Sequence, residues 1–250
     1  MGWRLDFSER LASFPKRLIL HIFKGCGMTL HEAVFANDFE VAHNLILKGV
    51  DIDKRDELGF SPIHYASVNG DINMVNLLIH YDCSLNIFDD VGNTPIHSAT
   101  FGENPEILKL LLEEGVDVNL RTKRGWSCLH IASMEKYIDV MMIILRYRPN
   151  LNSQDMLGLT PLHYAVQSEE IEMIEFLLGL GSNPNVRDAV GKSPLFTAIV
   201  RKNPKIVEIL LQHDSDFRAH DGYGNSAFEV AKTVNDEVVL DVLSKYGAKK

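Results

Sequence analysis

The chain has 250 residues, of which 46% are hydrophobic and 24% are charged. This composition is ordinary for a globular protein and provides enough apolar side chains for a core. The formal net charge of −9 repels phosphate backbones, which argues against general nucleic-acid binding. No run of about 18 apolar residues occurs, so we expect no membrane-spanning segment.

The three cysteines are odd in number and lack C-x-x-C spacing. This pattern fits reduced side chains better than a disulfide framework, and it indicates an intracellular protein, cytoplasmic or nuclear. The apolar patch at residues 18–23 is short, is interrupted by His21 and lacks a small-residue cleavage site. We therefore expect no signal peptide.

Residues 1–24 precede a 33-residue repeat and form an N-terminal extension with five basic side chains. We expect a helical cap that packs the apolar patch on the open end of the following repeats. Two alternatives stay open, namely a docking or membrane-surface segment and a disordered segment. Pro15 would break any helix that runs through the whole extension.

The repeat itself begins near residue 25 and is marked by glycines at intervals of 33 residues. The glycines open the words GFSPIHYA, GNTPIHSA, GWSCLHIA, GLTPLHYA, GKSPLFTA and GNSAFEVA. One period earlier, His31 and Ala33 stand in register with His64 and Ala66, which makes seven copies.

Each word predicts a first helix, because a Ser or Thr side chain can cap a helix whose first residue is Pro. About ten residues later an apolar stretch with helical spacing predicts a second helix, for example over residues 107–112. Glycines stand where every other second helix should end, as left-handed caps do. They are Gly49, Gly115, Gly181 and Gly247. An Asp- and Gly-rich hairpin tip then leads to the next word.

The period and the T-P-L-H-x-A word closely resemble the ankyrin repeat family over residues 25–250, and residues 160–165 match the word in full. The resemblance implies an all-α solenoid of helix-loop-helix units with short β-hairpin tips. We place the repeats at residues 25–57, 58–90, 91–123, 124–156, 157–189, 190–222 and 223–250. The last repeat is more polar, as a terminal cap should be.

Catalysis finds no support in the sequence, and we expect no enzyme, cofactor or metal site. Five histidines are the histidine of the repeat word. Packed helices lie roughly 8–10 Å apart, so a ladder at that pitch cannot bring its members to within about 2.3 Å of one zinc ion. No nucleophile elbow, phosphate-binding loop or dinucleotide-binding motif occurs. The pair Asp89 and Asp90 is expected to be a solvated turn.

Partner-binding residues are expected where packing leaves the repeat free to vary, next to the repeat glycine and just after the repeat alanine. The large apolar side chains there, above all Phe60, Trp126 and Leu159 after the glycine, are expected to form an exposed stripe, which usually marks a binding surface. The candidate residues are Phe60, Phe88, Val91, Phe101, Arg121, Lys123, Arg124, Trp126, Met134, Met156 and Leu159.

The sharpest local feature is the basic tip Arg121, Lys123 and Arg124 beside Trp126. Trp and Arg are frequent interface hot spots, and a basic tip could hold an acidic segment of a partner. The alternative is a solvated tip with the indole lying over the neighbouring hairpin. The hairpin asparagines Asn86, Asn119, Asn152 and Asn185 are expected to hydrogen bond the turns. The family resemblance adds hydroxylation of such asparagines as an option.

These expectations favour a monomeric, non-enzymatic adaptor or scaffold that binds one or more proteins on a concave face and at the hairpin tips. The alternative is a stoichiometric inhibitor of an enzyme or transcription factor, as some short ankyrin proteins are. The sequence does not name the partner, because fold alone does not imply function.

Overall fold

The computed structural model describes residues 27–247, so the predicted N-terminal extension at residues 1–24 lies outside the described part. Its helices divide into two compact units after Val116. The first unit contains α3 (Leu30–Phe35), α4 (Phe39–Leu47), α5 (Pro62–Asn69), α6 (Ile72–His80), α7 (Pro95–Phe101) and α8 (Pro105–Glu113). The second contains α9 (Cys128–Glu135), α10 (Ile138–Arg146), α11 (Pro161–Ser168), α12 (Ile171–Gly179), α13 (Pro194–Val200), α14 (Pro204–Gln212), α15 (Ala227–Thr233) and α16 (Glu237–Lys245).

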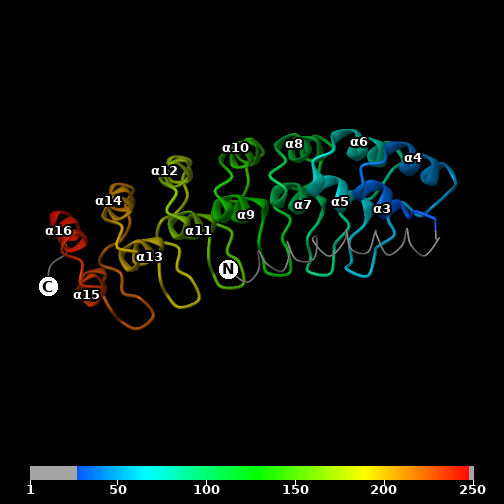
Figure 1. Cartoon of the computed structure of the whole chain (residues 1–250). Helices are drawn as coiled ribbons and strands as arrows, with labels where there is room; N and C mark the ends of the chain where they lie inside the picture. The colour runs from blue at the N-terminus through cyan, green and yellow to red at the C-terminus, as the bar shows by residue number, and fades with distance from the viewer. Residues whose placement is uncertain (1–26, 248–250) are drawn as a thin grey trace. The chain divides into compact units, whose positions relative to one another are not determined.

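Within each unit the helices form antiparallel pairs that stack in two layers (Figure 1). The first helices pack side by side as an inner layer, α3–α5–α7 in one unit and α9–α11–α13–α15 in the other. The second helices form the outer layer. Ala66, Leu78 and Leu111 in the first unit and Ala132 and Leu177 in the second are fully buried. The small alanines let neighbouring inner helices approach closely, and stacking buries apolar faces that one pair would expose. The predicted all-α ankyrin fold is confirmed.

Four inner helices, α5, α7, α9 and α11, begin with a capping arrangement in which histidine replaces the usual acidic residue. At α5, His64 Nδ1 accepts a hydrogen bond from the Ser61 N–H at 3.1 Å. Because Nδ1 is the acceptor, Nε2 carries the proton and donates to the carbonyl oxygen of Asn93 in the next repeat, at 3.1 Å. The repeat-word histidine therefore fixes both the start of its own helix and the spacing to its neighbour.

The first and last described inner helices use glutamate for this purpose. In α3 the cap is Thr29, one position later than the Ser or Thr of the other words, and it pairs with Glu32. In α15, Ser226 pairs with Glu229 at the histidine position. Hydrogen bonds from Ser226 lower the pKa of Glu229. Glu229 is thus a helix cap as well as a polar residue of the terminal repeat.

Every outer helix ends in a left-handed turn, whether or not glycine is present. Gly115, one of the predicted cap glycines, has φ +86°. In the repeats without such a glycine, Asp82, Arg148 and Asp214 adopt the same conformation with φ of 57°, 51° and 62°. The alternation of glycine in the sequence therefore does not reflect an alternating backbone. A non-glycine residue accepts about 1 kcal/mol of strain at this position.

The tips between repeats are tight turns closed by main-chain hydrogen bonds. In the first of them, the Asp56 N–H donates to the Phe60 carbonyl oxygen at 2.8 Å. In the described part of the chain, β pairing is confined to one isolated antiparallel bridge between His220 and Ser226. The predicted hairpin tips are thus present as turns that carry no extended strands.

Candidate functional site

The large apolar residues that follow a repeat glycine are buried, which corrects the expectation of an exposed apolar stripe. Phe60, Trp126 and Leu159 expose 1%, 8% and 9% of their surface. The carbonyl oxygens of Phe60 and Leu159 accept hydrogen bonds from the repeat-word histidines of the preceding repeats. Because this bond fixes the backbone beneath the tip, the side chain lies against its own inner helix, where the Phe60 ring is 5.3 Å from that of Tyr65. The position after the glycine therefore serves packing.

Trp126 belongs to a buried polar cluster. Its indole N–H lies 3.1 Å from Asp155 Oδ2 and 3.1 Å from the Tyr164 hydroxyl oxygen. The Tyr164 hydroxyl donates to the same Asp155 oxygen at 2.7 Å. Burial and this hydrogen bond raise the pKa of Tyr164. The indole thus links two successive repeats, and an interface role for the ring as an exposed hot spot is wrong.

The basic tip is divided between structure and surface. Arg121 donates through Nε to the carbonyl oxygen of Gly125 at 3.0 Å and through Nη2 to that of Gln154 in the next tip. Lys123 and Arg124 are exposed, and the Arg124 guanidinium lies over the indole of Trp126, 5.2 Å from its centroid. Arg121 therefore stabilises the turn, while Lys123 and Arg124 keep their charges at the surface.

An aspartate that sequence reasoning missed holds each tip. Asp155 Oδ1 accepts the N–H groups of Leu157 and Leu159 at 2.8 and 2.9 Å. Aspartate or threonine recurs here at the same 33-residue interval as the glycines, which was the signal available in the sequence. The equivalent residues are Asp56, Asp89, Thr122, Asp188 and Asp221. Asp89 is consequently buried, so the expectation of a solvated Asp89–Asp90 turn is wrong for Asp89 and correct only for the exposed Asp90.

Main-chain hydrogen bonds join the tips of the second unit into a row. The N–H groups of Met156, Ala189 and Gly222 donate to the carbonyl oxygens of Arg124, Leu157 and Val190 at 3.0, 2.9 and 3.1 Å. Asparagine side chains add a second row, because Asn119, Asn152 and Asn185 each accept an N–H from the following repeat at 2.7–2.8 Å. For these three asparagines the expected turn-stabilising role is confirmed.

The exposed apolar surface of this row is formed by the residues before the glycine. Four side chains, which we call the tip ridge, are Met156, Leu157, Val190 and Tyr223, with 74%, 62%, 49% and 74% of their surface exposed. Of these, only Met156 was a predicted site residue. The signal for the other three was an apolar residue directly before successive repeat glycines.

The remaining predicted residues do not belong to the tip ridge. Phe88, Val91 and Phe101 belong to the first unit, where Phe88 is exposed and the other two are half-buried. Met134 is half-buried near the end of α9 in the second unit. The structure thus includes Met156 in the tip ridge and brings Lys123 and Arg124 close to it, while the other candidates either stabilise the fold or do not belong to the ridge.

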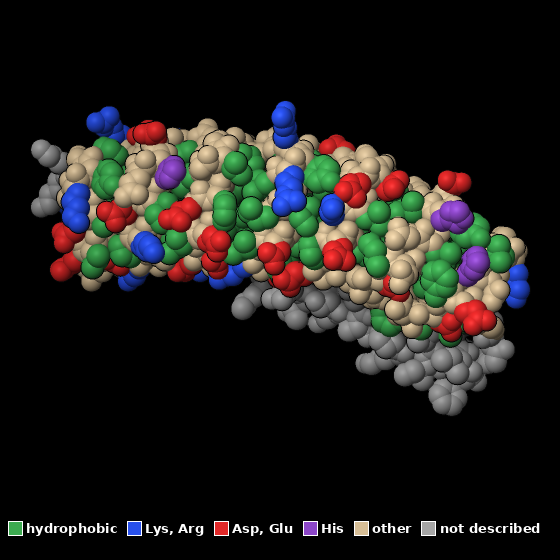
Figure 2. All heavy atoms as spheres, turned by 90° about the horizontal axis from the view of Figure 1, so that it is seen from above, with side chains coloured by type: hydrophobic (Ala, Val, Ile, Leu, Met, Phe, Trp, Pro, Cys, Tyr) green, Lys and Arg blue, Asp and Glu red, His purple; other side chains and the backbone are tan. Residues whose placement is uncertain are grey.

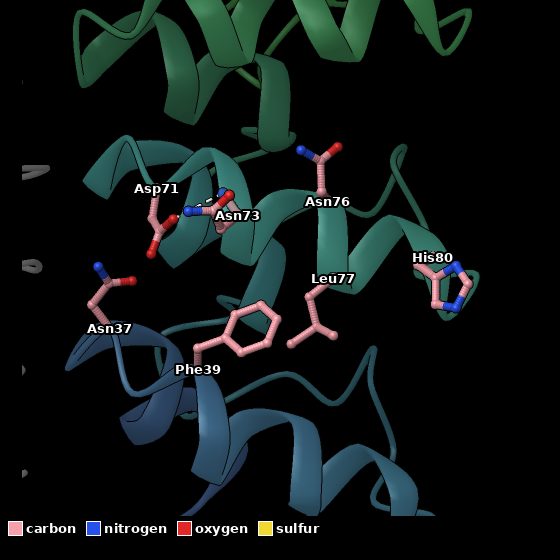
Figure 3. Close-up of a pocket in the computed structure, with 7 residues that line it drawn as sticks. All are labelled: Asn37, Phe39, Asp71, Asn73, Asn76, Leu77 and His80. Carbon is pink, nitrogen blue, oxygen red and sulfur yellow. Dashed lines mark hydrogen bonds between the residues drawn. The ribbon is translucent and has the colours of Figure 1, made fainter.

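A separate groove of about 620 Å³ lies between α4 and α6 on the outer side of the first unit (Figure 3). Phe39 and Leu77 face each other across it, and Asn37, Asp71 and Asn73 lie at one end. Asp71 accepts the Asn73 N–H at 2.9 Å as part of the cap of α6. The groove therefore combines an apolar floor with a polar rim whose aspartate already serves its own helix. The outer-helix face carries hydrophobic side chains in separate groups among acidic and basic ones (Figure 2).

The buried histidines of the repeat word are structural hydrogen-bonding groups. Burial lowers the pKa of His31, His64 and His163, and it lowers the pKa of His130 to about 4. These rings are neutral near pH 7 and hold carbonyl groups of the next repeat. Among residues 27–247, no group of three or more His, Cys, Asp or Glu side chains is arranged to hold a metal ion. In the same part of the chain, no helix is both long and apolar enough to cross a bilayer.

Comparison with known proteins agrees with this architecture. The family model described as ankyrin repeats in three copies matches residues 30–122 and 101–188. Among solved structures, the chain is similar to the crystal structure of the ankyrin repeat domain of Bcl-3, a member of the IkappaB protein family, with 25% sequence identity and a TM-score of 0.78. That alignment covers 87% of this chain and 98% of the other. No curated protein matches the chain. Because the family match spans more than half of the residues and the helix pairs have the expected form, the protein belongs to the ankyrin repeat family.

Proposed function

We propose that the protein is a non-enzymatic adaptor or scaffold that binds a partner protein through the tip ridge of its second unit. The observation that carries this proposal is the row of exposed apolar side chains on tips that are hydrogen bonded to one another. Ankyrin repeat domains typically mediate protein–protein interaction, and the family is generally non-catalytic. The buried, free Cys83 fits an intracellular location.

The energetics of the tip ridge favour binding. Each large apolar side chain contributes roughly 1.5–3 kcal/mol when it moves from full exposure to full burial. The turns are held by Asp155, Asp188 and Asp221, so little backbone order has to be gained on association. Preorganised surfaces bind more tightly because they lose less conformational entropy.

A stoichiometric inhibitor is the second candidate, supported by the similarity to an ankyrin domain from the IkappaB family. Both roles use the same surface and differ in what happens to the partner. An adaptor leaves the partner active and joins it to another protein, whereas an inhibitor lowers the activity of the partner at a one-to-one ratio.

Site-specific photocrosslinking tests the proposed surface. A photoreactive amino acid would replace Tyr223 in the tip ridge or, as a matched control, the exposed Leu180 that follows α12. We expect crosslinks to a partner from position 223 in cell extract and none to that partner from position 180. Mass and activity of the purified complex then separate adaptor from inhibitor. Equal crosslinking at both positions, or none at position 223, would contradict the proposed surface.

A further inference from the structure

The tip ridge has a spacing and a charge that specify the kind of segment it can hold. Resting on the proposed function, we propose that it binds an extended, acidic segment of a partner protein in which apolar residues recur at every third position. Leu157, Val190 and Tyr223 would contact three successive apolar residues of that segment. Cationic side chains beside the ridge would contact the acidic residues between them.

The spacing follows from the repeat. Each tip belongs to one helix pair, and packed helices lie about 8–10 Å apart, so equivalent tip residues repeat at about that distance. A polyproline II-like extended chain has three residues per turn and a rise of about 3.1 Å per residue. Every third side chain then lies on the same face about 9 Å from the last. A β-strand places alternate residues on one face, about 7 Å apart, which does not match the tips.

The charge of the tips opposes that of the whole chain. Residues 121–126, 154–159, 187–192 and 220–225 contain five Lys and Arg side chains but only three Asp side chains. Each of these aspartates accepts N–H groups of its own turn, so its carboxylate is directed into the tip. The tips of the second unit are therefore a locally basic surface on a chain whose formal net charge is −9.

Cations flank the tip ridge at both ends. Lys123 and Arg124 are exposed beside Met156, whose N–H is bonded to the Arg124 carbonyl oxygen at 3.0 Å. At the other end, the Lys192 ammonium lies over the Tyr223 ring, 5.8 Å from its centroid. An acidic segment laid along the ridge therefore meets a cation at both of its ends.

The row is held at a fixed spacing by features that exclude larger side chains. A Cβ atom on Gly158 would lie 2.7 Å from the Ala189 nitrogen, so glycine is required for the tips to approach and hydrogen bond. Arg187 donates through Nε to its own Gly191 carbonyl oxygen at 2.8 Å and through Nη2 to the His220 carbonyl oxygen of the next tip. Gln154 bridges two tips in the same way. The spacing is therefore a property of the backbone, independent of any partner.

Fluorescently labelled ten-residue peptides test the proposal by anisotropy with the full chain. The probe repeats Leu-Asp-Glu, its permutation has the same composition with leucines at every second position, and its basic counterpart repeats Leu-Lys-Arg. We expect the probe to bind at least about tenfold more tightly than either control, and its affinity to fall as salt is raised. Tighter binding of the permuted peptide would overturn the spacing argument, and tighter binding of the basic peptide would overturn the charge argument.

Matched variants locate the binding. Leu157→Ser with Val190→Ser removes apolar contacts, and Lys123→Gln with Lys192→Gln removes charge. Each pair should weaken the probe about tenfold or more, while Leu180→Ser on the exposed outer side should not change its affinity. Circular dichroism checks that each variant folds. Equal binding to all variants would overturn the proposal.

The outcomes separate this inference from the proposed function. If position 223 crosslinks to a partner but the probe neither binds nor displaces that partner, the inference fails and the proposed function stands. If the chain forms a dimer that the Leu157→Ser and Val190→Ser pair abolishes, a second copy occupies the ridge and the inference is overturned. If neither crosslinks nor peptide binding occur, both fail.

Discussion

Acidification should destabilise the second unit through His130. This ring is fully buried, accepts the Ser127 N–H at Nδ1 and bonds the Leu159 carbonyl oxygen through Nε2 at 3.2 Å. Burial lowers its pKa from 6.5 to about 4. In the unfolded chain the ring binds a proton more readily than in the folded protein, so the unfolded state gains stability as the pH falls below 6.5.

The magnitude follows from the two pKa values. The loss of unfolding free energy caused by His130 is absent above pH 6.5, grows as the pH falls from 6.5 towards 4, and is constant below pH 4. With about 1.4 kcal/mol for each pKa unit, the full loss is about 3 kcal/mol, of which about 2 kcal/mol is reached at pH 5. The pKa of His31, His64 and His163 is lowered in the same direction, so the whole chain should lose more than His130 alone accounts for.

Urea unfolding at pH 7.5 and pH 5 measures this effect, and His130→Gln is the matched control. Glutamine can keep the capping bond to the Ser127 N–H and does not titrate. The variant should be less stable at pH 7.5, because it loses the bond to Leu159, but its stability should fall less on acidification by about 2 kcal/mol. The reasoning would be refuted if the variant and the unmodified protein lost the same free energy of unfolding between pH 7.5 and pH 5. A pKa of 6.5 or above for His130 by NMR titration would refute it as well.

Three further comparisons test the roles assigned to buried and strained positions. Trp126→Ala should lower the free energy of unfolding by about 3–5 kcal/mol, because it removes a buried ring and leaves its polar partners unpaired. Trp126→Phe should lower it by about 1–2 kcal/mol. If urea unfolding showed a loss below about 0.5 kcal/mol for Trp126→Ala, as for a surface residue, the burial of Trp126 would be contradicted. Gly158→Ala should lower the melting temperature more than Gly181→Ala. Both glycines have positive φ, but only a Cβ on residue 158 would lie 2.7 Å from the Ala189 nitrogen. Equal melting temperatures of the two variants would argue against the close approach. Arg148→Gly should raise the free energy of unfolding by up to about 1 kcal/mol by relieving a φ of +51°, and a loss of stability in the same assay would show that the strain is absent.

The architecture could be predicted from local sequence signals. A 33-residue period, capping residues before first-turn prolines and apolar residues at helical spacing are local signals, and each is repeated often enough to be read without a structure. The turn asparagines Asn119, Asn152 and Asn185 were assigned correctly for the same reason, because their partners lie at a fixed distance along the chain.

Only the tertiary structure decided which tip residues face solvent. Large apolar residues occur on both sides of the repeat glycines, and their type alone does not show which side of the turn faces solvent. The histidine bond to the carbonyl oxygen after the glycine holds Phe60 and Leu159 beneath the tip, and Trp126 is buried at the same repeat position. The residues before the glycine, Leu157, Val190 and Tyr223 among them, are left outside. The binding surface therefore depends on contacts between repeats, which the sequence of one repeat does not contain.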